Sequence, residues 1–519
     1  MPIIFHACIL SKINNYGKIE HMLFFGKKPI LKILFVASEA APFAKAGGLG
    51  EIMYSLPKAL NKLGYDARIM IPRYLTIDSE KFPMKILERE LFIPNGSDEP
   101  IECNVKIYEP PKGNEKAPTT AYFLENTEYY EKRANIYGYA DDAVRWALLS
   151  RGVLEFIRFH KQWQPDVIVA CDWQTGLISN YLHTEYKDSP VLKNIAVLFS
   201  IHNLYYQGMF DHHFVSEMDY DAGQQAIPPL NDPRLLKLNF MRRGIMYADI
   251  INTVSPTYAK EITTPDYGEL LEDLLCERRG RLYGVLNGID YGEWNPETDS
   301  HIGFNFNVKT THKRIANKKI LQQKFNLPVN NETFVAGIVS RFTEQKGFDL
   351  LIDTADALLR NFDMQLVVLG TGDGRYMGFF QDLQNRYPQK VACHLSFDAS
   401  LPRIIYAGAD TILIPSRYEP SGLTQMEAMR YGAIPIVRKT GGLADSVIDY
   451  NPTEQTGNGF VFEKFDHYAF YGTIIRALEA YKYKEFWAEL QKRAMMADFS
   501  WEMSAREYGK LFEKAIALH

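Results

Sequence analysis

The sequence predicts an α/β protein with two doubly wound, Rossmann-like domains that face each other across a cleft. Three observations point to this fold class. At 519 residues the chain is too long for a single hydrophobic core. Apolar runs of strand length alternate with helical patterns in both halves, and glycine-rich turns follow several of these runs. Because ligands bind beyond the carboxyl ends of the strands in such sheets, we expect the functional site in the cleft.

In the first half, Lys32–Ser38 is a continuous apolar run, which is typical of a strand buried on both faces. A glycine-rich turn at Lys45–Gly50 follows, and then a helical pattern that Pro57 is expected to kink or restart. The polar, proline-rich segment Pro110–Thr120 is expected to form a surface loop. Three further runs have strand character: Ala67–Ile71, Val167–Ala170 and Ile195–Ser200. Strand, helix and strand in this order form the unit of a parallel sheet.

The second half is more regular, because five strand-like runs are each followed by a helical segment. The runs are Phe334–Val339, Gln365–Leu369, Val391–His394, Thr411–Ile414 and Ile434–Val437. This alternation predicts a second doubly wound domain. The amphipathic segment Trp501–Leu518 is expected to be a helix.

A polar stretch between Asn295 and about Ala316 replaces the aliphatic runs, and we place the domain junction there. The expected divisions are an N-terminal extension at 1–29, a first domain at 30–298, a second domain at 299–498 and a C-terminal helix at 499–519. That helix could pack back on the first domain.

Composition excludes several classes of function. The formal net charge is −5 and no long basic stripe is present, so a nucleic-acid partner is not expected. No apolar run approaches the ~18–20 residues of a membrane span. The opening Met1–Leu10 lacks the features of a signal peptide, and Met22 is an alternative start. The five cysteines are scattered, without a C-x-x-C pair, so neither a disulfide framework nor a zinc site is expected. These features predict a cytoplasmic protein.

Two loops at predicted strand ends offer positive charge. Lys45–Gly50 combines a cation, the bare amides of Gly47 and Gly48, and a helix start, which suits an anion or a sugar hydroxyl. A tight turn has the same composition, and the spacing matches neither a P-loop nor a dinucleotide-binding turn. Farther along, Arg341 and Lys346 should lie near a helix N-terminus, where two cations could bind a diphosphate. They could also be ordinary surface cations.

Two further loops contain acidic residues and glycines. Glu419 precedes the predicted helix Leu423–Tyr431, and Glu427 lies eight residues after Glu419, within that helix. Acids at this spacing often belong to a solvated helix face, but Glu419 sits among proline and glycine in a loop that should open into the cleft. The fourth loop carries a glycine pair, Gly441 and Gly442, at the start of another helix.

Taken together, these motifs resemble those of glycogen and starch synthases of the bacterial and plant type, which are retaining glycosyltransferases of the two-domain GT-B architecture. The resemblance covers roughly residues 30–515 and rests on eight segments in family order. They are KAGGLGE at Lys45–Glu51, DWQTGL at Asp172–Leu177, SIHNLYYQGMF at Ser200–Phe210, NTVSPTYAKEI at Asn252–Ile262, ERRGRLYGVLNGIDYGEWNPETD at Glu277–Asp299, SRFTEQKG at Ser340–Gly347, PSRYEPSGLTQMEAMRYG at Pro415–Gly432 and TGGLADSV at Thr440–Val447.

The resemblance implies roles for individual residues. It places Lys45 near the distal phosphate and glucose of the donor, Arg341 and Lys346 at the diphosphate, and Glu419 at the glucosyl unit. The other implied residues are Asp141 in the acceptor-side pocket, His202 and Asn239 at the sugar, Phe397 beside the adenine, Gly441 and Gly442 at the phosphates, and Glu427 at the ribose.

Three positions depart from the family pattern. Cys171 stands where many bacterial members have histidine, Ser421 stands where the family usually has cysteine, and Glu427 is retained although many close relatives lack it. The first change weakens the assignment of a site residue at that position, and the third could affect the choice of nucleotide.

The resemblance implies transfer of glucose, with retention, to the 4-hydroxyl at the end of an α-1,4-glucan such as glycogen. ADP-glucose is the favoured donor and UDP-glucose the alternative. Two cations and helix termini could stabilise the leaving group, so no metal and no cofactor are expected. Two alternatives remain open: a retaining glycosyltransferase with another acceptor, and a non-catalytic glucan-binding relative with Cys171 as its marker.

Overall fold

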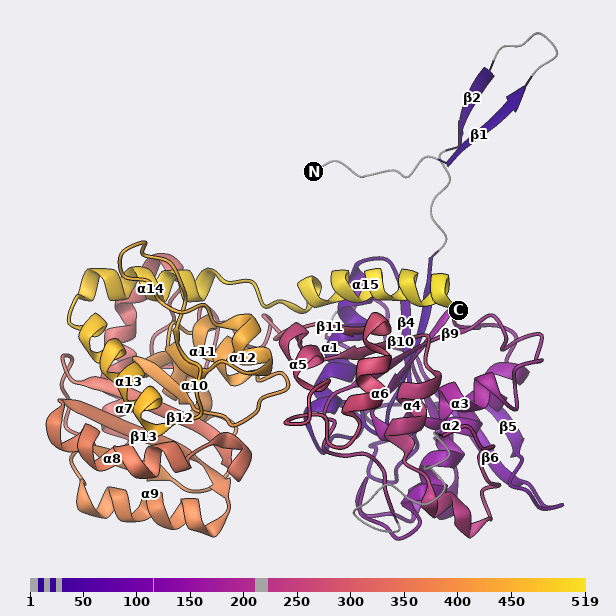
Figure 1. Ribbon diagram of the computed structural model, residues 1–519, viewed down its shortest axis with the longest axis horizontal. Helices are drawn as coiled ribbons and strands as arrows, with labels where there is room; N and C mark the ends of the chain where they lie inside the picture. The colour runs from indigo at the N-terminus through magenta and orange to yellow at the C-terminus, as the bar shows by residue number, and fades with distance from the viewer. Residues whose placement is uncertain (1–7, 14–18, 25–29, 115, 211–222) are drawn as a thin grey trace.

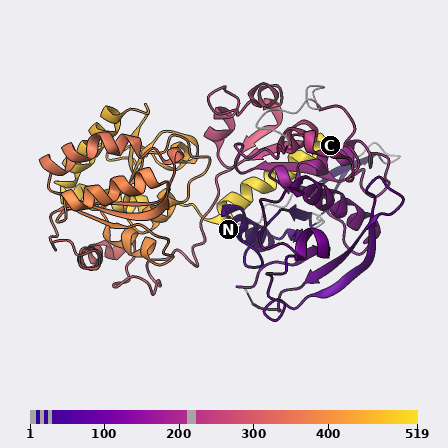
Figure 2. The same ribbon diagram turned by 90° about the horizontal axis from the view of Figure 1, so that it is seen from below.

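The computed structural model describes residues 8–13, 19–24, 30–114, 116–210 and 223–519. Much of the expected N-terminal extension, including most of Met1–Leu10, lies outside these ranges. Within it, β1 (Cys8–Ile13) and β2 (Ile19–Phe24) pair as antiparallel strands. The remainder forms two α/β lobes that lie side by side (Figures 1 and 2). Each lobe is built around its own sheet and its own hydrophobic core.

The N-terminal lobe contains a nine-stranded sheet in the order β11-β10-β9-β8-β3-β4-β7-β6-β5. Its strands are β3 (Lys32–Val36), β4 (Asp66–Pro72), β5 (Lys85–Ile93), β6 (Ile101–Tyr108), β7 (Ala121–Glu125), β8 (Val167–Cys171), β9 (Ala196–Ile201), β10 (Ile250–Thr253) and β11 (Leu282–Gly284). The pairs from β11 through β7 are parallel, whereas β6 pairs antiparallel with both β7 and β5. The helices of this lobe are α1 (Gly48–Lys62), α2 (Asp142–Phe159), α3 (Leu177–His183), α4 (Phe240–Tyr247), α5 (Pro256–Glu261) and α6 (Glu272–Glu277).

The C-terminal lobe contains a six-stranded sheet in the order β14-β13-β12-β15-β16-β17, and every pair is parallel. Its strands are β12 (Phe334–Phe342), β13 (Met364–Gly372), β14 (Val391–His394), β15 (Thr411–Ile414), β16 (Ile434–Arg438) and β17 (Phe460–Phe462). Its helices are α7 (Arg314–Lys324), α8 (Asp349–Asn361), α9 (Gly374–Arg386), α10 (Leu401–Gly408), α11 (Thr424–Arg430), α12 (Gly441–Ser446), α13 (His467–Tyr481) and α14 (Lys484–Met496). Two sheets flanked by helices confirm the predicted fold class.

One expectation about the first lobe is wrong in part, because the helix does not restart at Pro57. It lies inside the continuous helix α1, with a buried side chain. A proline in a helix loses one backbone hydrogen bond. Here Met53, Leu56 and Leu60 on the same helix are also buried, so packing against the sheet holds α1 together through the proline.

The chain crosses between the lobes twice. Val285 belongs to the core of the first lobe and Ile289 to that of the second. After α14 the chain returns, and α15 (Trp501–Leu518) packs on the first lobe, with Trp501 and Phe512 in its core (Figure 1). In the described part of the chain, no helix combines the length and the apolar character that crossing a membrane requires.

Candidate active site

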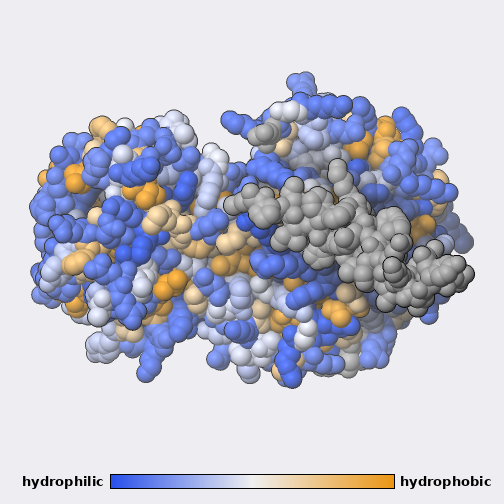
Figure 3. Space-filling model, turned by 90° about the horizontal axis from the view of Figure 1, so that it is seen from above, coloured by the Kyte–Doolittle hydropathy of each residue, from blue (hydrophilic) through white to orange (hydrophobic). Residues whose placement is uncertain are grey.

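A cavity of about 660 Å³, which we call the cleft cavity, lies between the two lobes and is lined by residues of both. The first lobe contributes the start of α1 and the loops that follow β8 and β9. The second lobe contributes the loops that follow β12 and β15. These loops follow the carboxyl ends of parallel strands, where α/β sheets bind ligands. Where the two lobes meet, the face seen in Figure 3 shows apolar residues amid a mostly hydrophilic surface.

The glycine loop of the first lobe is fixed by a carboxylate from inside the protein. Glu39 is 2% exposed, and it accepts hydrogen bonds from the amides of Ala46, Gly47 and Gly50, at 2.9 Å from Gly47 and 3.2 Å from Gly50. The Gly47 amide therefore already has an anionic partner. Gly47 and Gly48 line the cleft cavity as predicted candidates, whereas Lys45 pairs with Glu51 outside its lining.

The two predicted cations of the second lobe both line the cleft cavity. Arg341 stands at the end of β12 with an exposed side chain. Lys346 lies one turn farther on and donates a hydrogen bond of 2.6 Å from Nζ to Oε2 of Glu419. Gly347, which ends this turn, has a φ of +69°, and a Cβ there would lie 2.0 Å from the carbonyl oxygen of Pro415. Glycine therefore allows the Lys346 turn to pack against the loop that carries Glu419.

Glu419 is held by two donors of its own lobe. Its Oε2 accepts from Lys346 and also from the Ser416 hydroxyl at 2.9 Å, and the side chain is nearly buried. Its loop leads into α11, and Leu423, just before this helix, lines the cleft cavity. The first amides of a helix have no intrahelical partner. The Glu419 loop and Lys346 thus present a carboxylate and an ammonium group to one space, next to the amides that begin α11.

Gly441 and Gly442 support this loop from behind. The Gly442 amide donates to the Glu419 carbonyl oxygen at 3.0 Å, and the Gly441 amide donates to the carboxylate of Glu261 on α5 at 3.1 Å. A Cβ on Gly441 would lie 2.0 Å from the Glu419 carbonyl oxygen, and one on Gly442 would lie 1.8 Å from that of Ser421. Neither glycine lines the cleft cavity, so their placement in the structure favours close packing of the loop.

His202 and Asp172 form a half-buried pair on the wall of the cleft cavity. The Asp172 carboxylate accepts from the His202 amide at 2.7 Å. Burial lowers the pKa of His202 to about 4 and raises the pKa of Asp172 to about 7. Asp172 has a φ of +57°, a strained value for a residue with a side chain. Among the described residues, Nδ1 of His202 has no hydrogen-bond partner.

The remaining candidates lie outside the lining of the cleft cavity. Asp141 pairs with Arg133 at 2.5 Å, and it is the neighbouring Asp142 that lines the cavity. Asn239 is buried and caps α4. Phe397 is 84% exposed. Their roles stay predictions.

Glu427 also lies outside the lining, on α11. Tyr406 donates a hydrogen bond of 3.2 Å to its carboxylate. Burial, reinforced by the charge of Glu293, raises the pKa of Glu427 to about 7. A role of Glu427 at the donor ribose therefore stays a prediction.

The lining residues that were not predicted as site residues include three that fix loops or connect the lobes: Glu39, Asp172 and Asn287. Asn287 connects the lobes, since its side-chain amide donates to the Ser421 hydroxyl at 3.2 Å. Asp172 and Asn287 lie within motifs that carried the family resemblance, which is the signal that could have found them. Cys171 lies behind the wall, buried against Met53.

In the described ranges, one group of side chains could hold a metal ion, namely His183, Asp249 and His519. None of the three lines the cleft cavity. The cavity itself offers cations, amides and single carboxylates of both lobes.

Comparisons with known proteins agree along the chain. The family described as "Starch synthase catalytic domain" matches residues 32–277, and "Glycosyl transferases group 1" matches residues 319–494. A glycogen synthase of Thermotoga petrophila is 43% identical over 493 residues, which cover 94% of this chain and 99% of that protein. One of Clostridium perfringens is 43% identical over 490 residues, covering 94% and 99%.

Solved structures agree as well. The catalytic domain of starch synthase IV from Arabidopsis thaliana, solved with ADP and acarbose bound, has a TM-score of 0.78 at 30% identity and covers 94% of this chain and 100% of that one. A sucrose-phosphate synthase from Thermosynechococcus elongatus reaches a TM-score of 0.54 at 18% identity, over 94% and 100%, which indicates a shared fold alone.

Proposed function

Because the chain belongs to the glycogen and starch synthase family of glycosyltransferases, we propose that it transfers glucose from ADP-glucose to the non-reducing end of an α-1,4-glucan, with retention of configuration. The observation that supports this most directly is the convergence of Arg341, Lys346 and Glu419 on one cavity between the lobes. Two cations beside a carboxylate suit a nucleoside diphosphate joined to a neutral sugar.

The two cations would stabilise the charge that develops on the leaving diphosphate. Arg341 is exposed in the cleft cavity and can turn toward a phosphate, whereas Lys346 is already fixed by Glu419. Preorganised donors of this kind contribute ~3–4 kcal/mol each to the transition state. Closure of the lobes would bring Lys45 toward them and exclude water, which would otherwise hydrolyse the donor.

His202 would bind the transferred sugar rather than a phosphate. With a pKa of about 4, its ring is neutral at pH 7 and offers one donor and one acceptor nitrogen. Nδ1 has no hydrogen-bond partner within the described residues but is covered by protein, so a sugar hydroxyl would reach it only after the ring turns. A neutral ring would add specificity for hydroxyl groups without attracting a second anion.

The preference for ADP-glucose over UDP-glucose rests on the family and on the ADP bound to the Arabidopsis relative. The cysteine at position 171 does not favour the non-catalytic alternative, because its thiol lies behind the wall of the cleft cavity. In this mechanism no metal ion is needed, because Arg341, Lys346 and helix amides would stabilise the negative charge of the leaving group.

Transfer of labelled glucose to glycogen from ADP-glucose and UDP-glucose, with and without EDTA, tests the proposal. We expect incorporation from ADP-glucose that survives EDTA and an α-configured product by NMR. Preference for UDP-glucose would overturn the donor assignment, and loss of activity with EDTA would overturn the metal-free mechanism. No incorporation from either donor by folded protein would favour another acceptor or a non-catalytic relative.

A further inference from the structure

The C-terminal lobe carries a second cavity, which shares no lining residue with the cleft cavity. We call it the outer hollow. It has a volume of about 490 Å³ and lies between the loop before β17 and the helices α13 and α14. In Figure 1, α13 lies in the half of the lobe away from the N-terminal lobe, and α14 runs along the upper edge of the C-terminal lobe. A ligand bound there would leave the cleft cavity free.

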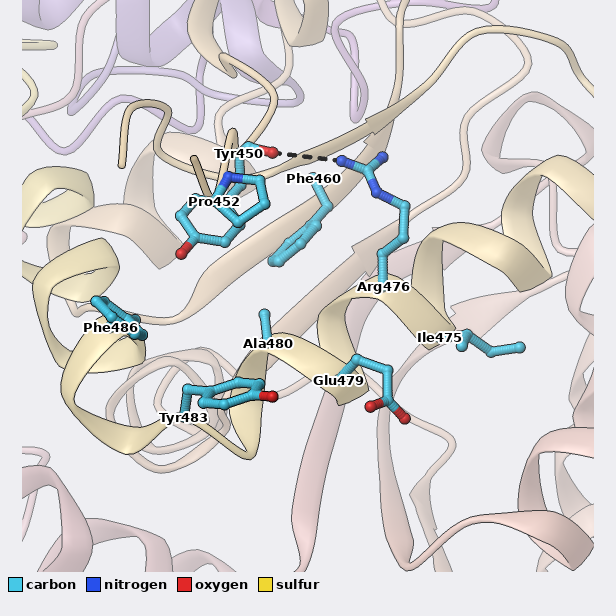
Figure 4. A pocket seen from close by; sticks show the side chains of 9 residues that line it. All are labelled: Tyr450, Pro452, Phe460, Ile475, Arg476, Glu479, Ala480, Tyr483 and Phe486. Atoms are coloured by element: carbon cyan, nitrogen blue, oxygen red, sulfur yellow. Dashed lines mark hydrogen bonds between the residues drawn. The ribbon is translucent and has the colours of Figure 1, made fainter. Parts of the chain in front are cut away.

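Four aromatic rings line the outer hollow: Tyr450, Phe460, Tyr483 and Phe486. Figure 4 shows the rings of Tyr450, Tyr483 and Phe486 around a common space above Ala480. The two inner rings are fixed, because Tyr450 and Phe460 are buried and their centroids lie 5.6 Å apart. The two outer rings are open to solvent, because Tyr483 is 64% and Phe486 45% exposed. Exposed rings gathered around a hollow are typical of a binding site.

The charged groups at the rim are neutralised by neighbours. Arg476 pairs with Asp449 at 2.8 Å and also donates to the Tyr450 carbonyl oxygen, which Figure 4 shows as a dashed line. Glu479 pairs with Lys482 at 2.7 Å. The outer hollow therefore offers hydrogen-bonding groups without an unpaired charge, which suits a neutral ligand with hydroxyl groups and disfavours a phosphate.

We propose that the outer hollow binds a short stretch of α-glucan and anchors the polymer acceptor while another chain end occupies the cleft cavity. The hydrogen-bearing faces of glucose are apolar and stack on rings, and its hydroxyl edges match the paired charges and the tyrosine hydroxyls. A branched polymer can occupy both sites at once, which converts the second binding event into an intramolecular one. The inference rests on the proposed glucan acceptor, but binding at this site requires no donor and no turnover.

The test compares the wild-type chain with the double variant Tyr483→Ala/Phe486→Ala. Both rings are exposed, so their removal leaves the core of the lobe intact. We expect the double variant to migrate faster than the wild type in gels that contain glycogen, because glycogen retards it less. Its apparent Kd for glycogen should be about tenfold weaker, which corresponds to ~1.4 kcal/mol. The KM for glycogen should rise by a similar factor, whereas the KM for the nucleotide-sugar and for maltotriose should stay unchanged.

Tyr468→Ala is the matched control, because Tyr468 is 76% exposed on α13, a helix that borders the outer hollow, and does not itself line it. Ala480→Trp is a second variant, which fills the space while all four rings remain, and it should weaken glycogen binding as the double variant does. Glycogen binding that is equal in the wild type and both variants overturns the inference. Binding to an apolar dye without competition by maltoheptaose also overturns it. Absence of glucose transfer would instead count against the proposed function, because the gel assay reads binding alone.

Discussion

At the scale of single residues, the chemistry of the cleft cavity depends on a few charged side chains, some fixed by partners and one exposed. Lys346 is fixed to Glu419, Glu39 is fixed to the glycine loop, and Arg341 is exposed in the cavity. A fixed charge contributes to both ground and transition states, whereas a charge that engages only the leaving group contributes to the rate. Arg341 is therefore the residue at which substitution should affect turnover most directly.

We predict that Arg341→Ala lowers kcat by about a hundredfold while the protein stays folded. The reason is that Arg341 has an exposed side chain and contacts the cavity rather than a core. Turnover from saturating nucleotide-glucose and the unfolding temperature are the measurements. Arg360→Ala, which removes an exposed arginine on α8, is the control and should leave kcat unchanged. Near-normal turnover of Arg341→Ala would contradict the assignment of Arg341 to the leaving diphosphate.

Glu427 gives a prediction about pH. Burial raises its pKa from 4.5 to about 7 in the folded chain. Between pH 4.5 and 7, the folded state therefore holds a proton that the unfolded state has lost. The contribution of Glu427 to stability is therefore present below pH ~4.5 and falls as pH rises to about 7, by up to ~1.4 kcal/mol per pH unit. Glu427→Gln removes this slope.

Urea unfolding of the wild type and Glu427→Gln at several pH values between 4.5 and 7 measures the effect. The variant should gain stability relative to the wild type as pH rises, because the amide keeps its hydrogen-bonding capacity without a charge to bury. The comparison cancels the opposite slope that His202, with its lowered pKa, gives to both proteins. A constant difference across this range would contradict the burial of the Glu427 carboxyl.

Some site residues could be predicted from the sequence and others could not, because different features of the chain place their side chains in the site. Arg341, Lys346 and Glu419 stand in loops next to strand ends, so the position of the strand already predicts where the side chains lie. Glu39 acts through a turn of the chain that brings its carboxylate back onto the amides of residues 46–50. Asp172 depends on a backbone conformation that no pattern of residue types specifies.

At the scale of elements, the loop that carries Glu419 is shaped by the element behind it. The start of α12 lies so close that Gly442 donates to the Glu419 carbonyl oxygen and leaves no room for a Cβ. We predict that Gly442→Ala shifts the Glu419 loop and lowers kcat more than tenfold, because misplacement by about an ångström costs that much or more.

The measurement for Gly442→Ala is kcat together with the unfolding temperature, and the control is Gly378→Ala. Gly378 lies in the middle of α9, and a Cβ there would meet nothing within 4 Å. An alanine in that helix should be neutral or stabilising by about 0.5–1 kcal/mol, with kcat unchanged. If both variants kept full activity, close packing behind the Glu419 loop would not matter for catalysis.

Strands were predictable where their own composition determines burial. The runs that became β3, β8, β9, β12 and β13 are apolar on both faces because helices cover them. Strand β5 is largely exposed at the sheet edge and rich in charge, and β11 and β17 are three residues long. Such strands exist because a neighbouring strand supplies hydrogen-bond partners, which the segment itself does not reveal.

At the scale of the whole molecule, the lobes are joined by more than the two crossings of the chain. Thr257 on α5 donates to Asp445 on α12 through its amide at 2.8 Å and its hydroxyl at 2.6 Å. Glu261 accepts from Thr440 and Gly441 at the same contact. These contacts lie beside the loop that holds Glu419, so movement of the lobes and the shape of the site are coupled through α5 and α12.

The last helix of the chain belongs to the first lobe, and this has a measurable consequence. Phe512 on α15 is fully buried, with its ring centroid 6.4 Å from Phe35 of β3 and 6.1 Å from Tyr65. We predict that Phe512→Ala destabilises the N-terminal lobe by ~3–5 kcal/mol, the usual cost of such a cavity. Calorimetry should show one transition move down in temperature. Ile516→Ala, at a position of the same helix that is 43% exposed, is the control and should shift it little. Equal shifts for both variants would mean that α15 does not complete the core of the first lobe, because only a buried ring leaves a cavity when it is removed.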